Sequence, residues 1–234
     1  MLIRAAVYDP QGLQRMMSNA DIFVTGEVTP AAQTSNAYTV TGADLAKPSF
    51  LCAETGNATY TLDTAANIVN VIAPFFGYNP NAANSAGTNV YSAIPNGTSW
   101  RVRFINAAAF TVTFAATANT GVTVNTRAVI AAGSSTTPNG RDLLVRIVCG
   151  APAQSYFCTT TNGNAVLGGL TAAQIATLAI GMVVTNAQAG QQGNTIIGID
   201  MNAGQVTMSG NSNATNAAPG VQFNFSPTIA VEVI

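Results

Sequence analysis

Two short stretches decide the fold class of this chain: WRVRFI at residues 100–105 and FTVTF at residues 110–114. In both, bulky apolar side chains recur at every second position, and a period of two is typical of a β-strand with one buried face. We expect two half-buried strands that form a hairpin through residues 106–109. Arg101 and Arg103 then lie on the face opposite to the apolar side chains of their strand.

Segments around this pair repeat the pattern more briefly. A strand is expected through Phe50 and Leu51, and further strands at residues 121–124, 127–130 and 142–148. Several short strands at close spacing indicate a sandwich, a barrel or a related antiparallel sheet. The predicted fold class is therefore all-β, mainly antiparallel and sandwich or barrel-like, with one short helix and an extended N-terminal arm.

The one helix is expected just after residue 62. Asp63 or Thr64 can cap it, because a side-chain oxygen there accepts a hydrogen bond from a free backbone N–H of the first turn. Its apolar residues, which recur at helical spacing and should lie against a sheet, are Ile68, Val71 and Ile72.

We divide the chain into an N-terminal arm (residues 1–46), a β-rich core domain with the helix (47–157) and a small β-rich C-terminal module (158–234). A strand that has no mate nearby in sequence commonly adds to the edge of another sheet, so such a strand in the arm is expected to pair with a sheet of another chain. The residues of this strand-like run are Ile22, Phe23 and Val24.

The C-terminal module is predicted as a short helix or turn at residues 171–178 followed by short strands. Those strands are expected at residues 182–185, 195–200, 205–209, 221–225 and 229–234. With roughly 75 residues, the module is small for a free-standing core, so we expect it to dock on the first domain or on copies of itself.

Charge is scarce throughout the sequence. Only 7% of the residues are charged and the formal net charge is −1, whereas about 25% are charged in an average soluble domain. Residues 148–198 and 201–231 contain no charged side chain. Such a surface gains little from charge repulsion and is expected to be buried against other subunits. Without a run of basic residues, neither nucleic acid nor an anionic membrane is an expected partner.

A membrane span is not expected either. Residues 165–184 are uncharged and about as long as a bilayer core requires. They lack the basic and aromatic flanks that anchor spans, and they continue directly into strand-like sequence. The N-terminus also lacks the apolar region and cleavage site of a secretory signal.

The side chains that usually carry catalysis are missing. The chain has no His, its only Lys is Lys47, and no phosphate-binding or dinucleotide-binding glycine motif is present. We predict no catalytic, cofactor-binding or metal-binding residues. The remaining enzymatic option is a carboxylate pair of Asp63 and Asp142, for which a helix cap and a neighbouring Arg141 or Arg146 are the simpler roles.

The three cysteines lack metal-ligand spacing. They are expected as buried free thiols and are Cys52, Cys149 and Cys158.

Four runs stand out in the C-terminal module: LAIGMVV (178–184), GNTIIGID (193–200), GQVTMS (204–209) and VQFNF (221–225). Together they resemble a β-rich unit that recurs in structural proteins of tailed bacteriophages. Residues 61–148 also resemble phage head-decoration and fibre-like proteins, in which a similar helix precedes similar strands. The arm and the polar loop at residues 75–95 depart from this resemblance.

The resemblance implies a non-enzymatic virion protein on the outer surface of a phage capsid. There it would bind the major capsid protein as a decoration or cement protein and stabilise the shell. It also implies self-association, and a homotrimer fits the three-fold sites of icosahedral shells. Two alternatives stay open: a tail or head-fibre component that contacts the host, and a polysaccharide-degrading tail enzyme.

Arg101 and Arg103 allow two interpretations. They form a solvated strand face, or they bind carboxylates at an interface, where arginine is enriched. With the strand-like run of the arm, they are the residues expected to contact other subunits or the capsid.

Overall fold

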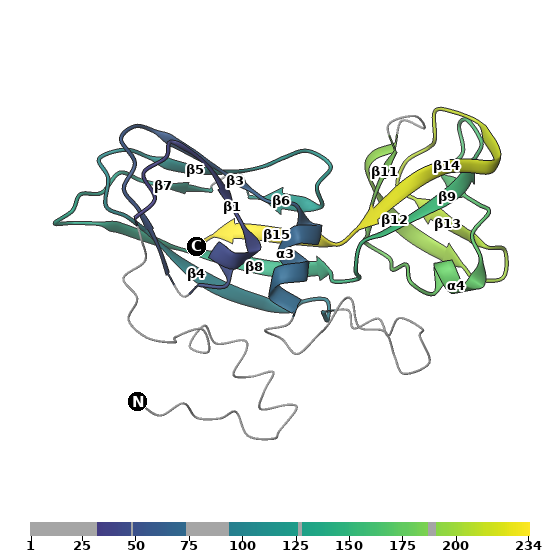
Figure 1. The fold of residues 1–234 in the computed structure, drawn as a ribbon, viewed down its shortest axis with the longest axis horizontal. Coiled ribbons are helices and arrows are strands. Elements are labelled where there is room, and N and C mark those ends of the chain that lie inside the picture. The colour runs from purple at the N-terminus through teal and green to yellow at the C-terminus, as the bar shows by residue number, and fades with distance from the viewer. Residues whose placement is uncertain (1–31, 48, 74–93, 126–127, 187–190) are drawn as a thin grey trace, which may run out of the picture.

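The two alternating stretches lie in different sheets that face one another. The computed structural model describes residues 32–47, 49–73, 94–125, 128–186 and 191–234. Figure 1 shows a larger lobe, in which a four-stranded sheet packs on a five-stranded sheet, and a smaller lobe with a six-stranded sheet. The prediction of an all-β fold is confirmed.

Each sheet draws strands from distant parts of the chain. The four-stranded sheet has the order β1 (Ala37–Val40), β3 (Ala58–Leu62), β5 (Val112–Ala116), β7 (Val129–Ile130). The five-stranded sheet has the order β2 (Ser49–Cys52), β4 (Ser99–Asn106), β8 (Asn139–Cys149), β15 (Thr228–Val233), β6 (Val122–Val124). The six-stranded sheet has the order β10 (Val166–Leu167), β13 (Gln205–Met208), β12 (Gln191–Asp200), β11 (Val183–Asn186), β14 (Asn216–Ser226), β9 (Gln154–Thr160). The helices of the described residues are α2 (Gly42–Leu45), α3 (Ala65–Ile72) and α4 (Ala172–Ile175).

The predicted hairpin between residues 100–105 and 110–114 is wrong. β4 pairs with β2 and β8, whereas β5 pairs with β3 and β7 in the opposite sheet. This crossing brings the apolar faces of the two strands together, and the rings of Phe104 and Phe114 meet edge to face at 5.0 Å between centroids.

Asn106 holds the chain where it crosses between the sheets. Its side chain is fully buried, and its Nδ2 donates to the carbonyl oxygens of Phe110 at 2.7 Å and Ala131 at 3.0 Å. Its Oδ1 accepts from the backbone N–H of Ala108 at 3.0 Å. A buried polar group without partners costs about 1–3 kcal/mol, so this residue fixes a path that strand periodicity cannot reveal.

The helix α3 begins as predicted. Thr64 is its N-cap, and its Oγ1 accepts a hydrogen bond from the backbone N–H of Asn67 at 3.2 Å. Val69 is buried instead of Val71, which is 39% exposed, so the assignment of Val71 to the buried face is wrong. The buried residues of the helix are Ala65, Ile68, Val69 and Ile72.

Residues 32–46 belong to the larger lobe and not to an arm. β1 pairs in parallel with β3, and Val40 and Leu45 are fully buried. The sequence did not indicate this because the segment offers only a few apolar side chains to the core. Gly42 lets α2 approach α3 closely: a Cβ at this glycine would lie 2.8 Å from Cβ of Val71.

Asp44 closes the first turn of α2. Burial raises the pKa of its carboxyl, but hydrogen bonds outweigh this effect and the pKa lies below its ordinary value. The donors are the Lys47 ammonium at 2.7 Å, the backbone and hydroxyl of Thr41, and the Tyr38 hydroxyl at 2.7 Å.

The final strand returns to the larger lobe. The sequence grouped residues 229–234 with the C-terminal module, but β15 pairs antiparallel with β8 and parallel with β6. Ile229 and Val231 are buried in the sandwich core. The smaller lobe is therefore an insertion between the adjacent strands β8 and β15, and Figure 1 shows it projecting from that end of the sandwich. Thr228 links the lobes, because its hydroxyl donates to the Gly181 carbonyl oxygen at 2.9 Å.

Some predictions fall on segments outside the described residues. These include the strand-like run Ile22, Phe23 and Val24, and most of the loop at residues 75–95. Within the described part of the chain, no helix is both long and apolar enough to cross a membrane.

Candidate interaction surface

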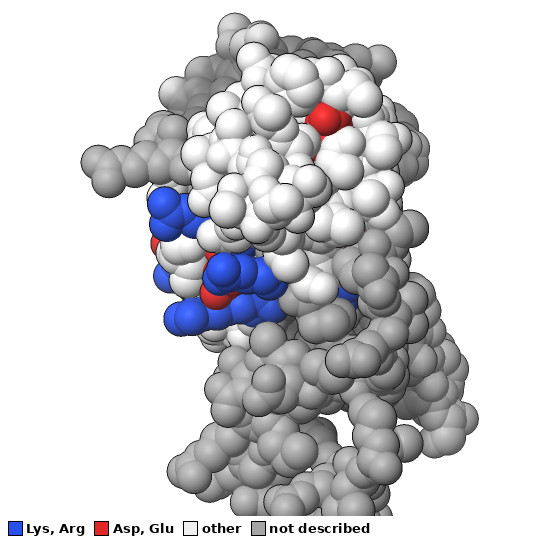
Figure 2. Space-filling view, turned by 90° about the vertical axis from the view of Figure 1, so that its left-hand side faces the viewer, with Lys and Arg blue, Asp and Glu red and all other residues white. Residues whose placement is uncertain are grey.

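The basic side chains of the described residues are concentrated on two neighbouring strands. Every described Lys or Arg except Lys47 lies on β4 or β8. In the view of Figure 2, blue side chains gather mainly in one region, with acidic atoms among them, and most of the other visible described surface is uncharged. The four arginines are Arg101, Arg103, Arg141 and Arg146.

Strand alternation places three of these arginines on one outward face. β4 and β8 turn their buried side chains toward the sandwich core, so the intervening positions point to solvent. In the antiparallel register Arg101 lies opposite Leu144, Arg103 opposite Asp142, and Arg146 opposite Ser99. Arg141 occupies an alternate position of β8, so its side chain belongs to the other face of the sheet. β15 adds Glu232 on the other side of Leu144. We call this set the arginine face: Arg101, Arg103, Asp142, Leu144, Arg146 and Glu232.

One ion pair lies on the arginine face. Arg103 Nη1 is 3.0 Å from Asp142 Oδ1, and the two side chains are 53% and 27% exposed. Asp142 therefore pairs with the arginine opposite it in register, and the expected pairing with Arg141 or Arg146 is wrong. Because the pair is exposed, it contributes only about 0–1 kcal/mol to stability.

The other two arginines of this face are available to a partner. Arg101 and Arg146 are exposed, and neither has an ion-pair partner within 4.0 Å among the described residues. Leu144, half-buried, lies between Arg101 and Glu232. A partly apolar centre with arginines around it is the composition found in protein interfaces.

The smaller lobe is almost free of charge. Among the described residues between 150 and 227, Asp200 is the only charged one. Its Oδ1 accepts from the backbone N–H groups of Asn202 and Ala203, both at 3.0 Å. Asp commonly forms turns in this way.

The two carboxylates considered for polysaccharide cleavage are not brought together. Asp63 Oδ1 accepts from the Thr64 backbone N–H at 2.7 Å, at the start of α3. The start of α3 and Ile229 both form backbone hydrogen bonds with residues 120–121, so the helix begins close to Ile229 on β15. Asp142 forms backbone hydrogen bonds with Ile234, which follows the other end of β15. Five residues of strand separate these points, about 16 Å. Glycosidases hold their carboxylates about 5–9.5 Å apart.

Glu54, which follows β2, is a buried charged residue of the larger lobe. Glu54 is 4% exposed and accepts a hydrogen bond from the Tyr60 hydroxyl. Burial and the nearby Glu54 charge raise the pKa of the Cys52 thiol to about 12. All three cysteines are free and buried, as predicted. Nothing in the sequence pattern around Glu54 marks it as buried.

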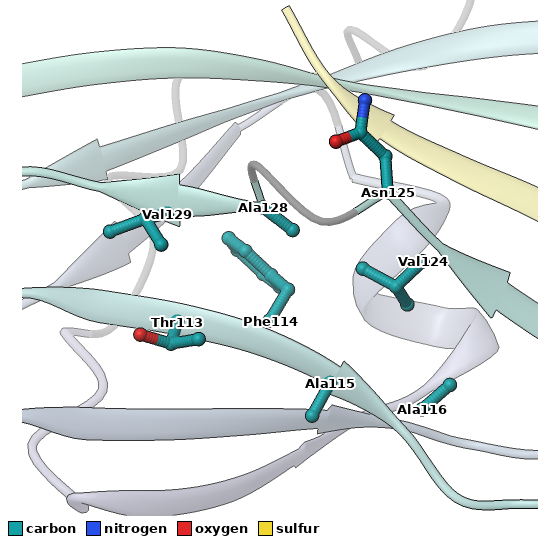
Figure 3. Close-up of a pocket in the computed structure, with 8 residues that line it drawn as sticks. All are labelled: Thr113, Phe114, Ala115, Ala116, Val124, Asn125, Ala128 and Val129. Atoms are coloured by element: carbon teal, nitrogen blue, oxygen red, sulfur yellow. The ribbon is translucent and has the colours of Figure 1, made fainter.

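A pocket of about 300 Å³ opens at the side of the sandwich. Figure 3 shows the Phe114 ring projecting from β5 toward Ala128, with Val124 across the opening. Its lining residues carry no ionisable side chain, so it offers shape but no catalytic group. The lining residues are Thr113, Phe114, Ala115, Ala116, Val124, Asn125, Ala128 and Val129.

The described residues contain no group of three or more His, Cys, Asp or Glu that could hold a metal ion. The arginine face therefore remains the clearest chemical feature of the surface. Sequence reasoning found Arg101 and Arg103 but missed Arg146, Leu144 and Glu232. The alternation of residues 142–148 could have placed Arg146 and Leu144 together on one face of their strand. Comparison with models of protein families, with curated proteins and with solved structures finds no match.

Proposed function

We propose that this protein is a non-enzymatic structural component of a bacteriophage particle, and that it binds the outer surface of the capsid through its arginine face. In this role it is a decoration or cement protein whose partner is the major capsid protein. The proposal combines the resemblance found in the sequence with the distribution of charge over the folded chain.

The concentration of arginines on one exposed sheet face is the observation that carries the proposal. In a chain this poor in charge, three arginines that share one sheet face stand out from the rest of the surface. A rigid sheet loses little conformational freedom on binding. The matching partner surface is an acidic one, because Arg101 and Arg146 can each donate two parallel hydrogen bonds to a carboxylate.

The same face is a poor match for nucleic acid. Its three arginines are accompanied by Asp142 and Glu232, which leaves a net charge of +1. A nucleic-acid site gains its affinity from many phosphate contacts on a strongly basic surface. The mixed face suits a protein surface, where charges of both signs fix the register of the two partners.

Binding of this kind would stabilise a shell mechanically. Each copy that spans two capsid subunits adds its binding free energy to the contact between them, so that separation of the subunits requires loss of both interactions. The folded sandwich, with its buried aromatic core, supplies a stiff body for this purpose.

The test uses phage particles that lack this chain. We expect such particles to rupture at a lower temperature and under milder osmotic shock than complete particles. Adding the purified protein should restore resistance, whereas the double variant R101S/R146S should not. If particles without the protein survive heat and osmotic shock unchanged, the cement function is refuted.

A second candidate is a tail or head-fibre component that contacts the host. The observation that favours it is the position of the smaller lobe, which projects from one end of the sandwich as an insertion (Figure 1). In that case the sandwich would anchor the chain and the smaller lobe would be displayed. Images of particles with the smaller lobe labelled would place it on the head surface or at the tail.

A further inference from the structure

The strand β9 forms an edge of the six-stranded sheet. On one side it pairs along most of its length with β14. On the other side, its only pairing with described residues is the single bridge from Thr159 to Gly168. Both backbone hydrogen bonds of that bridge are formed, at 2.9 and 3.1 Å.

This bridge shows which backbone groups face outward. In an antiparallel strand, the N–H and C=O of one residue point to the same side, and successive residues alternate. Since Thr159 bonds away from β14, the backbone groups of Phe157 and Ser155 also point away from β14. No described residue forms a backbone hydrogen bond with them on that side.

The β9 edge lacks the features that usually protect an edge strand. Its sequence QSYFCTT contains no charged residue and no proline, and both are common devices against edge-to-edge pairing. Phe157 lies on this strand with 59% of its surface exposed. An open backbone edge and an exposed aromatic side chain therefore occur on the same short segment.

We infer that β9 is a self-association site, at which it pairs antiparallel with β9 of a second copy. If the outward-facing backbone groups of both Ser155 and Phe157 form hydrogen bonds, Ser155 lies opposite Phe157 of the second copy, and Phe157 lies opposite Ser155 of the second copy. The two-fold axis then passes beside Tyr156. This arrangement forms four inter-chain backbone hydrogen bonds and joins two six-stranded sheets into one continuous sheet.

A second copy fits this edge better than an unrelated protein. An antiparallel strand pair built from one sequence is self-complementary about a two-fold axis, so the same patch serves on both sides. The described part of the smaller lobe has only the charge of Asp200, so two copies can approach without strong repulsion. This contact is two-fold and differs from the homotrimer expected from the sequence.

The first experiment measures the oligomeric state of the full-length chain by sedimentation over a range of concentrations. We expect a monomer–dimer equilibrium, and we expect Phe157→Lys to raise the dissociation constant about tenfold or more, because it places a charge in the pairing edge. Ile197→Lys is the matched control. Ile197 is 57% exposed but lies on β12, which has a neighbouring strand on each side, so this variant should dimerise like the wild type.

A second experiment does not depend on the folding of the lysine variant. Residues directly opposite in a hydrogen-bonded antiparallel pair have Cα atoms about 5.5 Å apart, which is within disulfide range. Mild oxidation should therefore cross-link the variant S155C/F157C as a dimer, and I197C should stay uncross-linked.

A wild type that remains monomeric or sediments as a trimer would overturn this inference. Equal weakening by Phe157→Lys and Ile197→Lys, or no cross-link in S155C/F157C, would overturn it as well. Because the purified chain alone is used, these outcomes are independent of whether it binds a capsid.

Discussion

The return of β15 to the sandwich makes a specific prediction about truncation. A chain that ends at residue 157, the boundary expected from the sequence, lacks β15. A chain in which residues 150–227 are replaced by Asn-Gly keeps it. Cys149 and Thr228 are paired neighbours on β8 and β15, and a two-residue Asn-Gly turn is well suited to join such strands.

The magnitude follows from the side chains that the truncated chain loses. Ile229 is 0% exposed and Val231 is 1% exposed, and burial of each such side chain contributes about 1.5–3 kcal/mol. Their loss alone removes about 3–6 kcal/mol. Small domains have a total stability of only about 5–15 kcal/mol. The truncation also exposes the edges of β8 and β6, so we expect that chain to be largely unfolded.

Urea denaturation followed by tryptophan fluorescence measures this difference. The chain has a single tryptophan, and Trp100 is buried in the sandwich, where its Nε1 donates to the Leu45 carbonyl oxygen at 2.8 Å. The Asn-Gly variant should show a cooperative transition, and the chain ending at residue 157 should show none. If the two unfold with free energies within about 1 kcal/mol, the assigned role of β15 is refuted.

Three further predictions concern local features of the larger lobe and the thiols. Thr64→Ala should destabilise the protein by about 1 kcal/mol in urea denaturation, because α3 loses its N-cap; an unchanged midpoint would contradict this. The pKa of Asp44 is lower in the folded chain, so its stabilising contribution is complete above its unfolded pKa of about 3.9 and is lost as the pH falls through the folded value. Thermal melts in this acid range should therefore show a smaller loss of stability for Asp44→Asn than for the wild type. Burial raises the pKa of the Cys158 thiol to about 12, and together with the other buried thiols it should react with a thiol reagent at neutral pH only after unfolding; rapid labelling of the native chain would disprove this burial.

Local patterns predicted many of the strands and the helix cap, but they missed β1, β3, β9 and β10. The period of two located strands such as β4 and β5, and Thr64 marked the start of α3. Sheet membership could not be predicted, because alternation says that a strand has a buried face but not which sheet covers it. Asn106 redirects the chain between sheets through three side-chain hydrogen bonds, and a single polar residue in an alternating run gives no sign of this.

The candidate site was predictable only in part. Alternation alone places Arg101 and Arg103 on an outward face. Arg146 and Glu232 join them through the pairing of β8 with β4 and β15, which are contacts between residues far apart in sequence. The insertion of the smaller lobe between β8 and β15 separates these strands by many residues, and this separation is why the final strand was grouped with the wrong lobe.

The affinity of the purified protein for capsids that lack it, measured at low and high salt, tests the role of the arginine face most directly. We expect R101S/R146S to bind about tenfold or more weakly than the wild type, with a smaller dependence on salt. The control is Arg141→Ser. It removes an exposed arginine that belongs to the other face of the same sheet, so this variant should bind like the wild type. Equal affinity of R101S/R146S and the wild type at low salt would contradict the account.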